Sequence, residues 1–128
     1  MDLLLDTHVF LWWDDGGAHL SAEVRALIAD PASKIFVSAA SVWEIAIKRR
    51  IGKLRFDRSA VAANAANHFS ELAIEASDAE RAGDLAWDHR DPFDRMLVAQ
   101  SLQHSLTLVT CDPAIRGFDG IAMLWAAG

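Results

Sequence analysis

The sequence predicts an α/β fold in which a parallel sheet of short strands is covered by helices on both faces. Short, fully apolar runs are typical of strands buried on both faces, and helical stretches separate them along the chain. Alternation of strand and helix is typical of a parallel sheet. The 128 residues, of which 52% are hydrophobic and 23% charged, suffice for one sizeable core. We therefore expect residues 1–128 to form a single domain.

The first half of the chain is expected to hold two strands and three helices. Apolar runs predict the strands at residues 3–5 and 35–37. The helices are expected over residues 9–13, 22–29 and 39–50. Side chains that cap helix N-termini precede them: Asp6 or Thr7, Ser21 and Ser38. Residues that end helices follow them: Gly16 with Gly17, Pro31 and Gly52.

The second half continues the same alternation. Further strands are expected at residues 72–74, 106–109 and 121–124. Helices are expected over residues 58–69, from 77 to about 87, and over 93–104. Ser77 and Glu80 have the spacing of a capping box, which predicts the start of the second of these helices. Asp91 and Pro92 are a strong start signal for the third.

The net charge and the cysteine count narrow the class of protein. Twelve Lys and Arg against 18 Asp and Glu leave a net charge of −6, which argues against a protein that coats nucleic acid with positive charge. A nuclease whose surplus acids hold metal ions is compatible with this charge. The single cysteine, Cys111, excludes an internal disulfide and suits a reducing cytoplasm. With no long apolar run and no secretory signal, we expect a cytoplasmic protein without a membrane segment.

Four acidic residues are placed where ligands bind in such sheets, beyond the carboxyl ends of the strands. Asp6 follows its strand directly and Asp112 follows another two residues further on, whereas Glu44 and Asp94 lie on helices that the topology can bring to the same edge. Carboxylates gathered at one point repel each other, and divalent cations would neutralise them. A set of oxygen ligands selects Mg²⁺ or Mn²⁺ over zinc. The four acids therefore predict a metal site.

Each acid also has an ordinary structural interpretation. Glu44 can pair with Lys48 one turn on, or close a capping box with Ser41. Asp91 before Pro92 fits a helix N-cap. Helix caps, turns and contacts with the helix dipole would explain the remaining acids: Asp6, Asp94 and Asp112. The prediction of a metal site therefore depends on their joint placement.

Four segments resemble the motifs of PIN domains, in the same order along nearly the whole chain. They read LLLDTH at 3–8, SAASVWEI at 38–45, HRDPFDR at 89–95 followed by LVAQ at 97–100, and LVTCD at 108–112. The HRDPFDR string is the most specific of them. The resemblance is closest to the VapC toxins of bacterial VapBC toxin–antitoxin pairs.

This resemblance implies a three-layer α/β/α fold and a Mg²⁺- or Mn²⁺-dependent endoribonuclease that hydrolyses RNA by metal-activated water. It also implies a homodimer that a small VapB-like antitoxin silences. By motif position, the catalytic and metal-binding acids are Asp6, Glu44, Asp94 and Asp112. Asp91 is an additional acid in the third motif, and Thr110 lies beside the site, where it can hold a metal-bound water.

Half of all basic residues lie within residues 48–58, with only Asp57 opposing them. They are Lys48, Arg49, Arg50, Lys53, Arg55 and Arg58. These side chains could follow an RNA backbone, or they could form a solvated helix end where cations suit the dipole. Arg95 could likewise bind phosphate or form a local salt bridge.

Two other functions fit the same residues. One is a different Mg²⁺-dependent phosphoesterase; an aspartyl-phosphate enzyme would carry a second acid two residues after Asp6, where this chain has His8. The other is a non-catalytic α/β binding module in which the acids are only caps and turns. A binding module predicts a stability that does not respond to Mn²⁺.

Overall fold

The computed structural model describes residues 1–128 and confirms the α/β architecture. Five parallel strands form one sheet in the order β3-β2-β1-β4-β5. The strands are β1 (Asp2–Leu5), β2 (Lys34–Ser38), β3 (Ser70–Leu72), β4 (Thr107–Thr110) and β5 (Met123–Trp125). The helices are α1 (Thr7–Asp14), α2 (Ala22–Ala29), α3 (Ala39–Arg50), α4 (Ala60–Ala66), α5 (Ala76–Asp84), α6 (Pro92–Gln103) and α7 (Pro113–Arg116). None of these helices combines the length and the apolar character needed to span a membrane.

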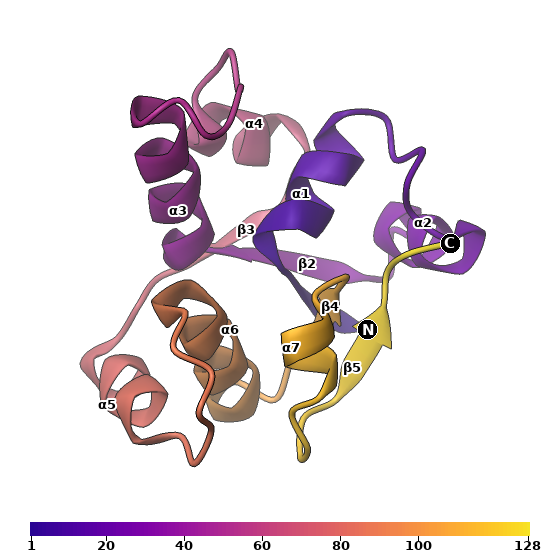
Figure 1. Ribbon diagram of the computed structural model, residues 1–128. Helices are drawn as coiled ribbons and strands as arrows, with labels where there is room; N and C mark the ends of the chain where they lie inside the picture. The colour runs from indigo at the N-terminus through magenta and orange to yellow at the C-terminus, as the bar shows by residue number, and fades with distance from the viewer.

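The sheet is the middle of three layers, with α1 to α4 on one side and α5 to α7 on the other (Figure 1). Side chains of the central strand β1 alternate between the two faces. Leu3 and Leu5 are fully buried in the core cluster shared with α1 to α4. Leu4 points the other way and packs with Leu97 of α6 and Ile115 of α7. The fully apolar run at the start of the chain is thus explained by burial on both faces.

The helix starts predicted at Asp6, Ser21 and Ser38 are confirmed. Asp6, Ser21 and Ser38 each accept a backbone N–H from the first turn of α1, α2 and α3, at 2.8 to 3.1 Å. After α1, Gly16 and Gly17 adopt φ values of 97° and 77°, a backbone conformation that residues with a Cβ rarely adopt. Local capping and turn chemistry therefore determines these boundaries.

The predicted capping box at Ser77 and Glu80 is wrong. The box is formed two residues earlier, where Asp78 Oδ2 accepts the Glu75 N–H at 2.9 Å and the Glu75 side chain accepts a backbone N–H in return. Helix α5 then ends at Asp84 instead of residue 87. Beyond this point the carbonyls of Leu85, Trp87 and His89 accept hydrogen bonds from Arg95 of α6 instead of continuing the helix.

Other boundaries also differ from the prediction. Strand β3 spans Ser70–Leu72 instead of 72–74, and its ladder ends where the Ala73 carbonyl accepts the side-chain amide of Gln100 at 3.2 Å. Helix α4 covers only part of the predicted 58–69 stretch, because Ser59 caps it and the chain turns back to β3 at its end. Strand β5 is displaced toward the C-terminus, and the short helix α7 was not predicted.

One edge of the sheet concentrates the beginnings of helices. Helices α1, α3 and α7 each begin within a few residues of the ends of β1, β2 and β4. We call this region the carboxyl edge, meaning the edge at which β1, β2 and β4 end. Backbone N–H groups at helix starts and the positive ends of helix dipoles favour acidic side chains here. The fold thus places the predicted site acids on a common edge.

Candidate active site

Asp6 and Thr110 join the ends of the neighbouring strands β1 and β4. The Thr110 hydroxyl and the Cys111 N–H, the latter at 3.2 Å, both donate to Asp6 Oδ2. Asp6 Oδ1 accepts the Val9 N–H that caps α1. Burial raises the pKa of Asp6, and the hydrogen bonds from Thr110, Val9 and Cys111 oppose this shift. Asp6 is therefore a buried carboxylate held in one orientation.

Asp112 lies beside this pair. Its backbone N–H donates to Thr110 Oγ1 at 3.0 Å, and its Oδ1 accepts the Ala114 N–H at 2.8 Å to cap α7. Between the two acids, burial together with the charges of Asp6 and Asp112 raises the pKa of Cys111 to about 12. The thiol thus stays protonated at neutral pH, which agrees with a packing role for Cys111.

The two acids of α6 differ in their surroundings. Asp91 is the N-cap, and its Oδ1 accepts the N–H groups of Phe93 (2.9 Å) and Asp94 (3.1 Å). Asp94 Oδ2 lies 2.7 Å from His89 Nε2. The pKa of Asp94 is raised to about 7, mainly by desolvation and also by the charges of Asp91 and Asp112, whereas His89 lowers it. Asp94 is thus the acid that responds most clearly to its acidic neighbours.

Glu44 lies in the second turn of α3 and is buried. The Thr7 hydroxyl donates to Glu44 Oε1 at 2.6 Å and lies 2.9 Å from the Ser41 hydroxyl. Lys48 Nζ donates to Glu44 Oε2 at 2.6 Å, which confirms the pairing one turn apart. This hydrogen bond is the largest cause of the raised pKa of Lys48, and the charges of Glu44, Asp91 and Asp94 raise it as well. Lys48 therefore faces the acids of α6 as well as its own partner.

Electrostatic coupling shows which predicted acids share one region. Asp94 responds to Asp112, the N-cap of α7, and to Asp91, the N-cap of its own helix; Lys48 responds to Glu44, Asp91 and Asp94. Asp6 joins the group through Thr110 and Asp112. No three Asp, Glu, His or Cys side chains lie at the mutual spacing of a complete metal cage. The acids thus form an open cluster at the carboxyl edge.

The donor set of this cluster fits a hard divalent cation. Mg²⁺ is usually held by one or two carboxylates and keeps several waters, so it does not require a complete cage. The residues that would hold such an ion are Asp6, Asp94 and Asp112, all of which offer carboxylate oxygens. Burial raises the pKa of Asp6 and of Asp94, and the hydrogen bonds to these carboxyl groups only partly offset the shift. Glu44 differs, because the Lys48 ammonium already balances its charge.

Arg95 has a role that neither of its predicted interpretations describes. Its guanidinium donates to five backbone carbonyls at 2.5 to 3.2 Å and forms no salt bridge. The carbonyls belong to Ala82, Gly83, Leu85, Trp87 and His89. All five N–H donors are used, so none remains for a phosphate. Arg95 instead organises the segment from the end of α5 to His89, and so positions the partner of Asp94.

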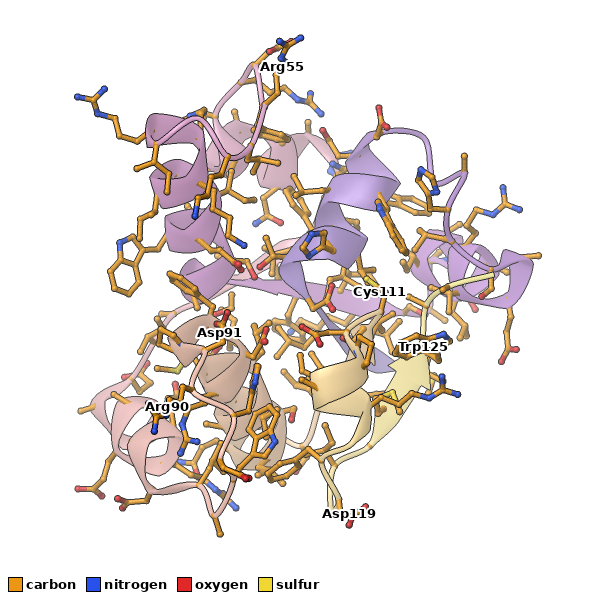
Figure 2. All side chains as sticks on the ribbon, viewed as in Figure 1. Arg55, Arg90, Asp91, Cys111, Asp119 and Trp125 are labelled. Atoms are coloured by element: carbon orange, nitrogen blue, oxygen red, sulfur yellow. The ribbon has the colours of Figure 1, made fainter.

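The predicted basic patch divides into two groups. Lys48 pairs with Glu44, Arg49 donates to the Arg58 carbonyl at 3.0 Å, and Arg58 forms an ion pair with Asp14. The three remaining side chains make no hydrogen bond or ion pair and are exposed: Arg50, Lys53 and Arg55. Figure 2 shows Arg55 projecting from the segment after α3, on the side of the molecule opposite Asp119. Only this second group has no partner within the chain.

Sequence reasoning missed the roles of Thr7 and His89. Both lie inside the segments quoted above: Thr7 directly follows Asp6, and His89 lies five residues before Asp94. Thr7 was considered only as an alternative helix cap, but Asp6 takes the cap and leaves the Thr7 hydroxyl to Glu44. His89 was not assigned a role. Its pairing with Asp94 depends on the path of a loop, which the sequence does not reveal.

Comparison with known proteins identifies the family. The family model of the PIN domain matches residues 3–121, so the chain belongs to the PIN domain family. This agrees with the motifs at the carboxyl edge. Comparison with curated protein sequences gives no significant match.

Solved structures with a similar fold include several toxin–antitoxin proteins. A toxin–antitoxin complex from Klebsiella pneumoniae is 20% identical, with 96% of each chain covered and a TM-score of 0.66. VapBC2 from Rickettsia felis, bound to a DNA fragment from its promoter, is 12% identical, covers 97% of this chain and 98% of its own, and gives 0.65. VapC20 of Mycobacterium tuberculosis, a sarcin–ricin loop cleaving toxin, is 19% identical, covers 91% and 95%, and gives 0.59. At these identities the likeness establishes the fold.

Proposed function

We propose that the chain is a divalent-metal-dependent endoribonuclease, the toxin of a type II toxin–antitoxin pair, with residues 1–128 as one nuclease domain. The observation that carries the proposal is the open acid cluster at the carboxyl edge, in which the pKa of Asp94 is raised to about 7 with contributions from Asp91 and Asp112. Membership of the PIN domain family supports nuclease activity. The toxins among the structural neighbours, one of which cleaves the sarcin–ricin loop, support the toxin role and RNA as substrate.

The proposed reaction is hydrolysis of a phosphodiester bond. Water adds to phosphorus, the bond from phosphorus to the leaving ribose oxygen breaks, and that oxygen takes up a proton. A Mg²⁺ or Mn²⁺ ion bound here would supply positive charge next to the attacking water and the phosphate oxygens. Asp6, Asp94 and Asp112 would hold it. Asp6 is oriented by Thr110, and Asp94 by His89.

The remaining residues shape the site around these acids. Glu44 ties α3 to α1 through Thr7 and holds Lys48 beside the acids of α6. In this position the Lys48 ammonium can attract a phosphate of the RNA backbone, and Lys53 and Arg55 extend the positive charge along the next segment. Asp91 is assigned a structural role, because its Oδ1 caps α6.

Two protein partners belong to the proposal. The structural neighbours that are toxin–antitoxin complexes support a VapB-like antitoxin that silences the enzyme. A second copy of the chain is supported by an apolar stripe on α3, where Trp43 and Ile51 are each 59% exposed and Ile47 is 36% exposed. These residues lie four apart and so share one helix face. The free thiol of Cys111 and the RNA substrate favour a cytoplasmic location.

The test is cleavage of a mixed RNA pool by the purified chain, with Mn²⁺ and with EDTA, beside Asp94→Asn. We expect cleavage that requires both the metal and Asp94. Asp119→Asn is the matched control, because Asp119 is an exposed acid in the loop before β5, away from the carboxyl edge (Figure 2). Thermal melts against Mn²⁺ give a second readout, in which the wild type gains stability and Asp94→Asn gains less. A flat melt together with no cleavage would contradict the proposal and favour a binding module.

A further inference from the structure

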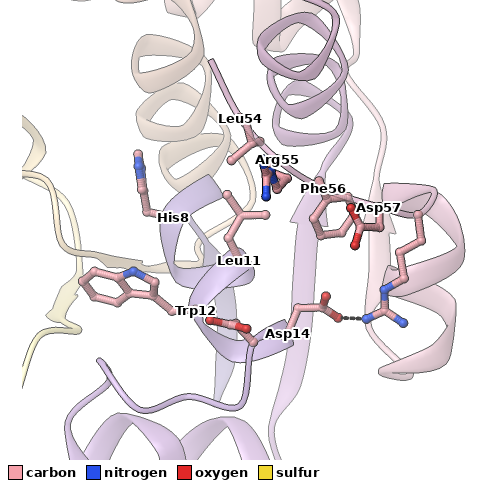
Figure 3. Close-up of a pocket in the computed structure, with 10 residues that line it drawn as sticks. His8, Leu11, Trp12, Asp14, Leu54, Arg55, Phe56 and Asp57 are labelled. Atoms are coloured by element: carbon pink, nitrogen blue, oxygen red, sulfur yellow. Dashed lines mark hydrogen bonds and ion pairs between the residues drawn. The ribbon is translucent and has the colours of Figure 1, made fainter. Parts of the chain in front are cut away.

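A cavity lies next to the acid cluster, between α1 and the segment 54–58. It has a volume of about 550 Å³, which falls in the range of ligand sites. One wall is a face of α1 that carries His8, Leu11 and Trp12 and continues to the C-cap residue Asp15, and the other wall is the segment 54–58. Figure 3 shows these two walls facing each other. We call this cavity the α1 groove.

The α1 groove continues into the carboxyl edge. A smaller hollow of about 240 Å³ shares His8, Leu11 and Leu54 with it, and is also lined by Thr7, Lys48 and Lys53. Thr7 and Lys48 are the two partners of the Glu44 carboxylate. A chain molecule that crosses the acid cluster can therefore extend past Lys48 and Lys53 into the α1 groove.

The charges of the groove change sign along its length. Lys48 and Lys53 lie near the acid cluster, and Arg55 follows them on the second wall. At the other end lie Asp14, Asp15, Asp57 and Arg58. Asp14 is paired with Arg58 and accepts the Asn67 amide at 3.2 Å, whereas Asp15 and Asp57 are exposed and their side chains have no hydrogen-bond partner. A ligand that fits this gradient carries negative charge toward the site and hydrogen-bond donors at its far end.

Aromatic side chains lie between these two ends. His8 is exposed, and Trp12 and Phe56 are half-buried. The rings of Trp12 and His19 are 5.2 Å apart, so the indole is supported by a second ring. Aromatic surfaces of this kind stack on unpaired bases of single-stranded RNA. An amphipathic peptide fits less well, because only four of the ten lining residues are hydrophobic.

We propose that the α1 groove binds the base of an unpaired nucleotide adjacent to the scissile phosphate, and selects a base that carries an exocyclic amino group. The proposal rests on the function proposed above. The phosphate of this nucleotide lies toward Lys53 and Arg55, and its base lies against His8 and Trp12. The carboxylates of Asp15 and Asp57 only accept hydrogen bonds, so they pair with the amino groups of C, A or G and disfavour U.

Binding is measured first, without cleavage. Fluorescent (C)8, (A)8 and (U)8 RNA are titrated with Asp94→Asn protein in EDTA, and their anisotropy is followed. We expect (C)8 and (A)8 to bind more tightly than (U)8. Added Trp12→Leu should weaken binding about tenfold, because one stacking contact is lost. His8→Ala removes an exposed ring and covers the case in which Trp12→Leu does not fold; Trp125→Leu, on β5, is the matched control.

The second measurement is the sequence preference of cleavage. Sequencing of the ends that the active enzyme produces from a random RNA pool should show one position next to the cut where U is depleted. Asp15→Asn with Asp57→Asn should remove this depletion, because amides also donate to the carbonyls of U. If RNA affinity is unchanged in Trp12→Leu and His8→Ala, the proposal is overturned, and the groove is left for a protein partner. Metal-dependent cleavage without any flanking preference would overturn it too, while leaving the nuclease intact.

Discussion

The Thr7 hydroxyl, in the first turn of α1, donates to Glu44 Oε1 of α3 at 2.6 Å, across 37 residues of sequence. Both groups are buried, and the other Glu44 oxygen is bound by Lys48 at the same distance. Buried carboxylates are costly unless their oxygens have partners. The pair therefore joins two helices at the carboxyl edge, and Lys48 balances the charge of the buried Glu44 carboxylate.

Thr7→Val is expected to lower the free energy of unfolding by about 2 kcal/mol, because a buried charged acceptor loses its donor while the side-chain shape is kept. Urea denaturation in EDTA measures this change. Thr7→Ser, which keeps the hydroxyl, is the matched control and should remain close to the wild type. Equal stability of Thr7→Val and the wild type would show that the hydrogen bond is not important.

Arg95→Lys is expected to destabilise the protein by about 2 kcal/mol or more, although it keeps the charge. A lysine ammonium has three donors on a flexible stem and cannot reach the five carbonyls that the guanidinium binds. The released segment contains His89, so the Asp94 contact should loosen as well. Urea denaturation measures the free energy of unfolding. Amide hydrogen exchange at residues 83–89 shows whether this segment is loosened locally.

A phosphate-binding role for Arg95 makes a different prediction. It requires Arg95→Lys to keep its stability and to weaken RNA binding with a smaller dependence on salt. The two outcomes can be separated in one protein preparation. Arg90→Lys is a suitable control, because Arg90 is exposed, lies in the same segment and makes no hydrogen bond.

Sequence reasoning predicted the features that depend on residues close together in the chain. The caps at Asp6, Ser21, Ser38 and Asp91 are local, because each side chain bonds to a backbone N–H two or three residues on. The placement of Asp6 and Asp112 at one edge also follows from strand order in a parallel sheet. What the spacing alone left open was how each acid is partnered: Glu44 by a lysine ammonium, and Asp6 by a hydroxyl and two backbone N–H groups.

Features that depend on tertiary packing were not predictable in this way. The five acceptors of Arg95 are carbonyls of a loop, and carbonyls carry no sequence signal. The same holds for Thr7, whose partner lies on another helix. Ser77 and Glu80 matched a capping box by spacing, but Glu75 and Asp78 offered an equivalent pair two residues earlier, and Asp78 is fully buried there against His104. The burial of Asp78 favours the capping box of Glu75 and Asp78 over the one that Ser77 and Glu80 could form.

The pKa of Asp94 predicts a dependence of stability on pH. An aspartate has a pKa of 3.8 in the unfolded reference, and Asp94 has about 7 in the folded protein. Between these values the folded state binds a proton that the unfolded chain has released, so stability falls as the pH rises from about 4 to about 7. In EDTA, Asp94→Asn should remove this contribution. As the pH rises from about 4 to about 7, the free energy of unfolding of the variant should therefore increase by roughly 2 kcal/mol relative to that of the wild type. Parallel pH profiles of the two proteins would contradict the shift.

The last prediction concerns the apolar stripe on α3. In a symmetric dimer each residue of the interface is present twice, so one substitution places two charges against apolar surface. Ile47→Lys is therefore expected to give a monomer by light scattering at concentrations where the wild type is a dimer. Its free energy of unfolding as a monomer should change by less than about 1 kcal/mol, because Ile47 is partly exposed in the single chain. Val61→Lys is the matched control, since Val61 is a 50% exposed apolar residue on α4, outside the stripe. A wild-type chain that is monomeric at every concentration, or a lysine variant that still dimerises, would show that the stripe is not the contact between copies.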